Sequence, residues 1–106
     1  MTKVLIFDSK DLAEKTIGLN KIIKVRIDNL EICLTRTRTD YFGFESSCPH
    51  MSDDLVKGRI NPDQEVVCPW HDYRFNLRSG EEAQSRCRDL KRYELSWDND
   101  QLFVHI

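Results

Sequence analysis

The pattern of apolar and polar positions predicts a chain built mostly from short β-strands. Residues 21–27 partly alternate, and residues 30–36 alternate, between apolar and polar side chains, as strands with one buried face do. Asp28 and Asn29 separate these runs and have the chemistry of a tight turn, so the two runs are predicted to form a hairpin. Further strands are predicted at residues 4–7, 41–44, 58–60, 65–67 and 75–77.

Other signals lie near the two ends of the chain. Ser9 is predicted to cap a brief helical turn. Residues 90–97 and 102–106 flank a polar Asp-Asn-Asp tripeptide and are predicted to form a closing hairpin. Residues 81–88 are polar and are predicted to be loop. Many short strands without a long helix indicate an all-β sandwich or barrel.

Length and charge narrow the function classes. The 106 residues fit one domain, and 16 basic against 18 acidic residues give a net charge of −2, so no nucleic-acid partner is implied. The apolar run at residues 4–7 is far too short for a secretory signal or a membrane span. We therefore expect a cytoplasmic protein with no membrane association, in a reducing compartment where clustered cysteines and histidines more often bind metal.

Two short segments carry the candidate chemistry. Cys48-Pro49-His50 is followed, after seventeen residues, by Cys68-Pro69-Trp70-His71. Two cysteines and two histidines are the ligand set of a Rieske [2Fe–2S] cluster, in which imidazoles replace the thiolates on one iron. Zinc accepts the same four ligands and stays an alternative, although common zinc spacings pair Cys with Cys and His with His.

The residues that follow extend this pattern. Residues 72–81 read DYRFNLRSGE and are similar to the run C-P-x-H-G-x-x-F-x-L-x-T-G-E. The chain thus resembles the Rieske-type [2Fe–2S] ferredoxins, small soluble electron carriers of bacterial Rieske oxygenase systems. The resemblance implies an all-β Rieske fold of antiparallel strands as a single domain over residues 1–106. It also implies a small cluster-binding subdomain inserted at approximately residues 45–78.

The same resemblance implies one Rieske [2Fe–2S] cluster per chain. Cys48 and Cys68 would bind the inner iron, and His50 and His71 would bind the outer iron nearer solvent. Exposed imidazole edges would then give electrons a short path to a docked partner.

The chain departs from the family pattern at two positions. Ser52 and Asp72 stand where oxygenase-type members usually carry glycine. Glycine permits unusual backbone angles, and Asp tolerates the left-handed region better than most residues. The second ligand loop is therefore expected to keep its shape.

A comparison with Rieske proteins of cytochrome bc complexes gives the expected potential. Asp53 and Trp70 occupy the places of two cysteines that form a disulfide in those proteins. Tyr73 and Phe75 occupy the places of a Ser and a Tyr whose hydroxyls bond the cluster there. Fewer such bonds stabilise the reduced state less, so a potential of roughly −150 mV is expected, at the low end of the Rieske range.

The resemblance implies a one-electron carrier and not an enzyme. It would carry electrons from a flavoprotein NAD(P)H reductase to a terminal Rieske oxygenase, as a monomer. Two alternatives stay open: a Rieske protein like the small subunit of nitrite reductases, and a zinc-stabilised binding module.

The remaining notable residues have simpler interpretations. Cys33 lies in an alternating run and is expected in the core. Cys87 lies in a polar loop and is expected to be a free thiol without a role. The charged run at residues 86–92 is interpreted as a solvated face that could help to dock an acidic redox partner. Trp70 is expected to shield the cluster or contact a partner.

Overall fold

The computed structural model describes residues 2–106 and consists mostly of antiparallel strands. The strands are β1 (Lys3–Phe7), β2 (Ile22–Ile27), β3 (Leu30–Arg36), β4 (Tyr41–Glu45), β5 (Arg59–Ile60), β6 (Glu65–Val67), β7 (Arg74–Asn76), β8 (Arg92–Tyr93), β9 (Leu95–Asp98) and β10 (Gln101–His105). The helices are α1 (Lys10–Thr16) and the 3₁₀ helix η1 (Leu55–Lys57). The predicted all-β class is confirmed.

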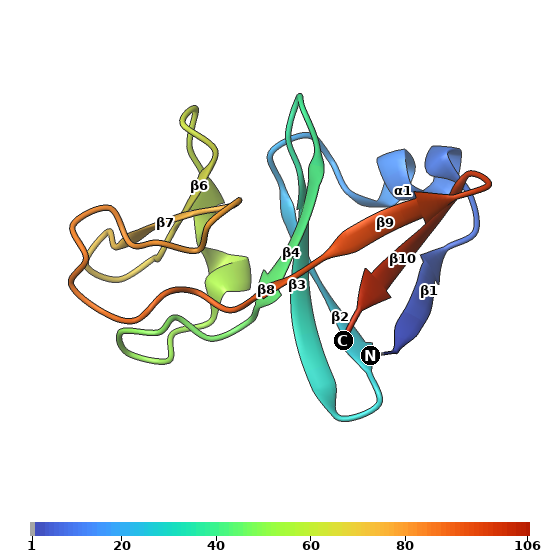
Figure 1. Ribbon diagram of the computed structural model, residues 1–106. Helices are drawn as coiled ribbons and strands as arrows, with labels where there is room; N and C mark the ends of the chain where they lie inside the picture. The colour runs from blue at the N-terminus through green and yellow to red at the C-terminus, as the bar shows by residue number, and fades with distance from the viewer. Residues whose placement is uncertain (1) are drawn as a thin grey trace.

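The strands form three sheets. The central sheet has the order β2-β3-β4-β8, a second sheet has the order β1-β10-β9, and a small third sheet has the order β5-β6-β7. Figure 1 shows the small sheet on one side of the central strands and the β1-β10-β9 sheet on the other. The small sheet is formed by chain that lies between β4 and β8 in the sequence.

Strand β3 separates two apolar cores, because successive side chains of a strand point to opposite faces. Ile32 and Leu34 pack in a core with residues of β1, α1 and β10. Cys33, between them, packs in a second core that reaches the small sheet. Burial on both faces explains why four successive residues of β3 are inaccessible to solvent. The prediction that Cys33 is a core residue is confirmed.

Two local predictions are confirmed at the level of single residues. The Ser9 hydroxyl accepts a hydrogen bond of 3.1 Å from the Leu12 amide and caps α1. Asn99 and Asp100 form a two-residue loop between β9 and β10, and both have positive φ angles. This is the turn geometry that matches the twist of a two-strand hairpin.

The predicted single strand at residues 90–97 is wrong. The segment divides into β8, which pairs with β4 of the central sheet, and β9, which pairs with β10 of the other sheet. Glu94 lies at the crossing point, and its carbonyl accepts from the His105 amide at 2.9 Å. One continuous alternating run in the sequence therefore contributes a strand to each of two sheets.

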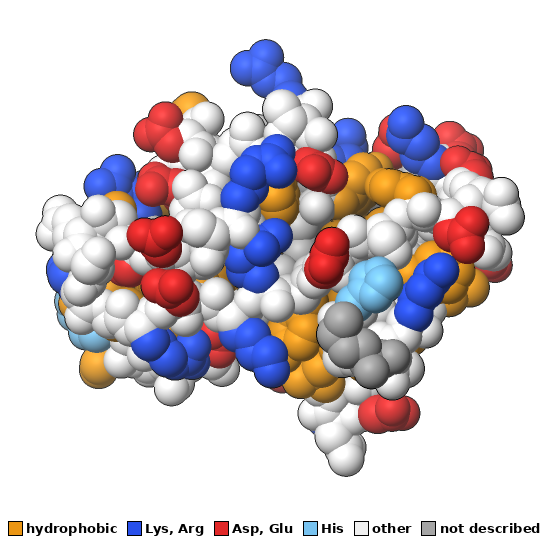
Figure 2. Space-filling view, in the orientation of Figure 1, with side chains coloured by type: hydrophobic (Ala, Val, Ile, Leu, Met, Phe, Trp, Pro, Cys, Tyr) orange, Lys and Arg blue, Asp and Glu red, His pale blue; other side chains and the backbone are white. Residues whose placement is uncertain are grey.

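Charges of both signs are interspersed over the face seen in Figure 2, in keeping with the small net charge. Within residues 2–106, no helix is long and apolar enough to cross a bilayer.

Candidate metal centre

The first Cys/His segment lies in a closed loop that follows β4. An isolated bridge between Ser47 and Asp54 joins the two ends of the loop. Inside it, the Cys48 amide donates to the Asp53 carbonyl and the Ser52 amide donates to the Cys48 carbonyl, each at 2.8 Å. These bonds hold the backbone around Cys48 and His50 in one conformation.

The second segment is the connection between the antiparallel strands β6 and β7. Its ends are tied by a 2.8 Å hydrogen bond from the Cys68 amide to the Tyr73 carbonyl. His71 and Asp72 both adopt left-handed backbone angles, with φ of 65° and 52°. Ser52 in the first loop has φ of 60°. The two positions where the chain lacks the usual glycine are therefore left-handed, and the loops keep their shape with Ser and Asp.

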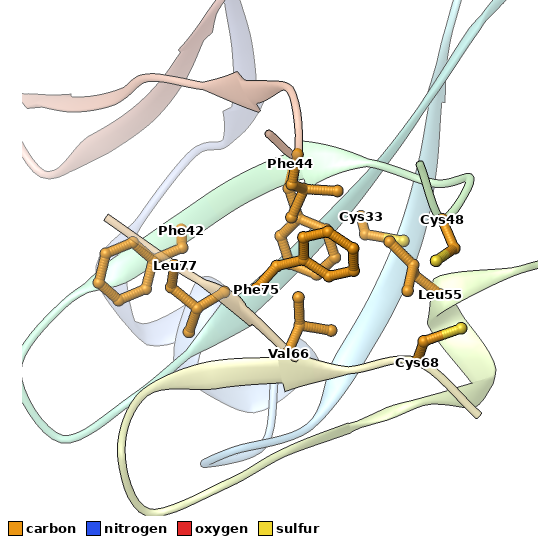
Figure 3. Close-up of a cluster of buried hydrophobic side chains, with 10 residues drawn as sticks. Cys33, Phe42, Phe44, Cys48, Leu55, Val66, Cys68, Phe75 and Leu77 are labelled. Carbon is orange, nitrogen blue, oxygen red and sulfur yellow. The ribbon is translucent and has the colours of Figure 1, made fainter. Parts of the chain in front are cut away.

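The fold brings the two segments together. The imidazole rings of His50 and His71 lie edge to face, with centroids 5.4 Å apart. The Cys48 and Cys68 side chains are buried at the edge of the apolar core shared with Phe75, and Figure 3 shows their sulfurs at the same end of this core. Burial, together with the neighbouring Cys48, raises the pKa of the Cys68 thiol to about 12. Metal binding would therefore have to displace a firmly held proton.

The four side chains suit a two-iron cluster. The Nδ1 atom of His50 is buried and has no hydrogen-bond partner among the described residues. A buried ring nitrogen without a partner costs free energy unless a ligand satisfies it. No three His, Cys, Asp or Glu side chains of residues 2–106 converge on a single-ion site. A [2Fe–2S] cluster divides its ligands between two irons, so they need not meet at one point.

The rim of the site is exposed. His71 is exposed, whereas His50 is half-buried and both cysteines are buried. Met51 and Trp70 are 59% and 61% exposed and place apolar surface beside the two histidines in the sequence. The exposure of Trp70 is compatible with a partner contact and excludes core packing.

A stack of side chains covers the other side of His50. The His50 and Tyr73 rings are nearly parallel, at 12°, with centroids 4.0 Å apart. The Arg86 guanidinium lies 3.8 Å from the Tyr73 ring centroid. Its Nε and one terminal nitrogen donate to the two carboxylate oxygens of Glu82, at 3.0 and 2.7 Å. No signal in the sequence indicated that Tyr73, Arg86 and Glu82 stack beside His50.

Glu82 is a buried carboxylate in a segment predicted to be a polar loop. It also accepts hydrogen bonds from the Gln84 and Arg86 amides. The Arg86 side chain, together with these amide bonds, lowers the pKa of Glu82 to about 2 despite its burial. Glu82 therefore carries its charge at all ordinary pH values.

The interpretation of residues 86–92 as a solvated face is confirmed for most of the run, because residues 86, 88, 89, 91 and 92 are exposed. Arg86 is paired with Glu82, and Arg88 makes two hydrogen bonds to Glu45, at 2.8 and 3.0 Å. Leu90 is buried. Arg88 is paired with a carboxylate distant in the sequence, whereas Arg86 is paired with a carboxylate only four residues away.

Comparisons with known proteins identify the family of the chain. The Rieske [2Fe-2S] domain family matches residues 2–94. A relative by sequence is the ferredoxin component of the alkene monooxygenase system of Xanthobacter autotrophicus, which is 28% identical over 51 residues. The aligned region covers 48% of this chain and 42% of the relative, so the chain matches less than half of the length of that relative.

Two solved structures share the fold over almost the whole chain. The ferredoxin of carbazole 1,9a-dioxygenase from Nocardioides aromaticivorans is 21% identical, with a TM-score of 0.80 and coverage of 98% of this chain and 97% of that one. A putative NADH-dependent nitrite reductase small subunit from Mycobacterium tuberculosis is 13% identical, also with a TM-score of 0.80, and the coverage is 97% and 93%. The family match extends over most of the chain. The chain belongs to the Rieske [2Fe–2S] domain family, and its cofactor is a Rieske [2Fe–2S] cluster.

Proposed function

We propose that this protein is a one-electron carrier whose cluster is held by Cys48, His50, Cys68 and His71. The unpartnered Nδ1 atom of His50 supports this assignment, as does the burial of the two thiols beside each other. When bound, the cluster takes up and releases a single electron. The domain is proposed to be one unit over residues 1–106, with residues 45–78 as the cluster-binding part.

The observation that carries this proposal is the gradient of exposure across the four side chains. Cys48 and Cys68 are 2% and 0% exposed, whereas His71 is exposed. An iron held by the cysteines would be shielded from water, and an iron held by the histidines would lie next to the surface. Such an arrangement suits electron transfer to a docked protein through the imidazole edge, and the protein is an electron-transfer component and not itself an enzyme.

The proposed partners are a flavoprotein NAD(P)H reductase as donor and a terminal Rieske oxygenase as acceptor. The oxygenase is supported by the descriptions of two relatives, which are ferredoxins of an alkene monooxygenase system and of carbazole 1,9a-dioxygenase. The reductase follows from chemistry, because NAD(P)H gives up two electrons and a one-electron carrier needs a flavin to divide them. We propose a monomer located in the cytoplasm.

The potential is proposed to lie at the low end of the Rieske range, near roughly −150 mV. Phe75 has no hydroxyl and is fully buried in the core. Tyr73 meets His50 with the face of its ring. Neither contact supplies a hydroxyl bond that would favour the reduced cluster.

A second candidate function is that of a small subunit in a nitrite reductase-type enzyme. The fold similarity to such a subunit has the same TM-score as the similarity to the carbazole dioxygenase ferredoxin. Fold alone therefore does not separate the two functions, and only the sequence relative favours the ferredoxin.

Stopped-flow spectroscopy tests the proposal. The oxidised protein is mixed with NADH and the flavoprotein reductase encoded beside its gene, and the reduced protein with the neighbouring oxygenase or with a nitrite reductase catalytic subunit. Bleaching by the reductase and rapid reoxidation by the oxygenase are expected. Reoxidation only by the nitrite reductase subunit would establish the second candidate instead.

A further inference from the structure

Four side chains form a continuous column beside the site. Glu82 binds Arg86 through two hydrogen bonds, Arg86 lies over Tyr73 at 3.8 Å, and Tyr73 stacks on His50 at 4.0 Å. The column starts in the loop after β7 and ends at a proposed cluster ligand. The four residues come from the two ligand loops and from an irregular segment after β7, so only the folded chain brings them together.

The far end of the column is firmly anchored. The Glu82 side chain is fully buried, and its carboxylate accepts two backbone hydrogen bonds as well as the two from Arg86. The segment around it is fastened to β7, where the Ala83 amide donates to the Arg74 carbonyl at 2.9 Å. Glu82 therefore holds the guanidinium in one place, which surface ion pairs seldom achieve.

Arg86 makes two contacts within the molecule. Its side chain is 34% exposed, one edge of the guanidinium faces Glu82, and one face covers Tyr73. A cation over an aromatic face is attracted by the ring, and the attraction grows as water is excluded. These contacts point inward, so the residue acts within the molecule even though one side of it is exposed.

We propose that Arg86 is a positioning residue that, held by Glu82, presses Tyr73 against His50, and that its charge favours the reduced state of the cluster. The inference rests on the proposed role of His50 as a ligand. Reduction adds one electron, and Arg86, the member of the ion pair that lies over Tyr73, places the positive end of the pair toward His50, where it stabilises the added negative charge. A ligand ring held by a stacked neighbour also keeps a single orientation at the metal.

The first test replaces the ion pair without changing the net charge. In Glu82→Gln/Arg86→Met both charges disappear, no unpaired carboxylate is left buried, and the Met keeps apolar bulk over Tyr73. The potential is measured electrochemically at neutral pH with the intact holoprotein, and the EPR line shape of the reduced cluster is recorded. We expect the equilibrium constant for reduction to fall about three- to tenfold, or about 30–60 mV at 59 mV per tenfold change, with broader EPR lines.

The matched control is a similar column elsewhere in the fold. Arg78 lies 5.1 Å from the Phe42 ring centroid and 3.6 Å from the Asp40 carboxylate. Asp40→Asn/Arg78→Met removes the same kinds of group at a place that does not contact His50. We expect this variant to keep the potential and the line shape of the wild type.

Variants of the ring in the column test the positioning step separately. Tyr73→Phe keeps the stacked ring and is expected to keep the EPR line shape, whereas Tyr73→Leu removes the ring and is expected to broaden the lines. Arg86→Lys keeps the positive charge but loses the pair of hydrogen bonds that the guanidinium makes to Glu82, so it should shift the potential less than the double variant does. Wild-type potential and line shape in both the double variant and Tyr73→Leu would overturn the inference.

The outcome is independent of the carrier function. The potential is measured without any protein partner, so a failure to reduce an oxygenase would refute the proposed function and leave this result standing. Conversely, retention of the cluster and its EPR signal in His50→Ala would refute the ligand assignment on which the inference rests.

Discussion

The rings of His50 and Tyr73 are stacked within 12° of parallel, at a centroid distance of 4.0 Å. The two residues come from different loops: His50 follows β4, and Tyr73 immediately precedes β7. The contact therefore joins the two ligand segments on their buried side, while the edge of His71 is left exposed to solvent. A rigid interior and an accessible histidine edge are the two properties that an electron carrier needs.

The cysteines are predicted to differ in their reactivity toward alkylating agents. Burial raises the pKa of the Cys33 thiol to about 12, so it should not react in the folded protein. Cys48 and Cys68 should be protected by iron, and only the half-buried Cys87 should react slowly, since burial raises its pKa as well. Mass spectrometry after iodoacetamide treatment at mildly alkaline pH measures the pattern.

Removal of iron provides the control for this labelling. After acid treatment and unfolding, all four cysteines should be labelled. Rapid alkylation of Cys48 or Cys68 in the intact holoprotein would contradict their assignment as ligands.

Glycine at the left-handed positions of the ligand loops should stabilise the protein. Ser52 and Asp72 have φ angles of 60° and 52°, a region that costs residues with a Cβ roughly 1 kcal/mol. Ser52→Gly and Asp72→Gly should each raise the free energy of unfolding by about 0.5–1 kcal/mol. Urea unfolding of the holoprotein measures the difference.

Ser47→Gly is the matched control, because Ser47 lies in the same loop and is not among the residues with positive φ. It should lower stability through the greater freedom of glycine in the unfolded chain. A loss of stability in Ser52→Gly as large as that in Ser47→Gly would refute the strain argument.

Gly80 is predicted to tolerate no side chain. Its φ is 82°, and a Cβ atom there would lie 2.3 Å from the Leu90 carbonyl oxygen, which is backbone and cannot move aside cheaply. Gly80→Ala should therefore lower the free energy of unfolding by about 1–3 kcal/mol. At Gly18 a Cβ would meet only the flexible Lys21 side chain, at 3.0 Å, so Gly18→Ala should cost much less. Equal melting temperatures for the two variants would contradict this prediction.

Glu82 should make part of the stability depend on pH. Its pKa falls from 4.5 in the unfolded chain to about 2 in the fold. A lowered pKa means that the stabilisation is fully present above pH 4.5 and is lost as the pH falls toward 2. The contribution is on the order of 3 kcal/mol.

Glu82→Gln isolates this contribution, because it has no carboxyl to titrate. The wild type should be the more stable of the two at neutral pH, and the gap should narrow below pH 4.5. If the difference in free energy of unfolding between wild type and variant stays constant from neutral pH down to pH 3 in urea unfolding, this would count against a charged Glu82.

Local signals in the sequence predicted the features that depend on a few adjacent residues. Ser9 predicted the helix cap and residues 98–100 predicted the hairpin turn, because both depend on side-chain chemistry within three or four positions. The two Cys/His segments likewise predicted which four side chains could bind the metal, because each segment spans only a few adjacent residues. Their closeness in space came from the resemblance to the family, since spacing alone places no two loops together.

Features that depend on distant contacts were missed. The crossing of the chain between two sheets at Glu94 has no signature in an alternating run. The burial of Glu82 depends on a loop that folds back onto β7. A polar segment looks solvated in the sequence unless the partner of its charge is known.

The measurement that tests the central claim most directly is pulsed EPR of the dithionite-reduced protein labelled with ¹⁵N-histidine, with iron, sulfide and zinc assayed on the same sample. The chain has three histidines, and His105 is hydrogen-bonded to Ser96 at 2.7 Å. A rhombic Rieske signal coupled to two histidine nitrogens, with two irons and two sulfides per chain, is the predicted result. A silent sample with one zinc and no sulfide, or a cluster signal without histidine nitrogen coupling, would contradict it.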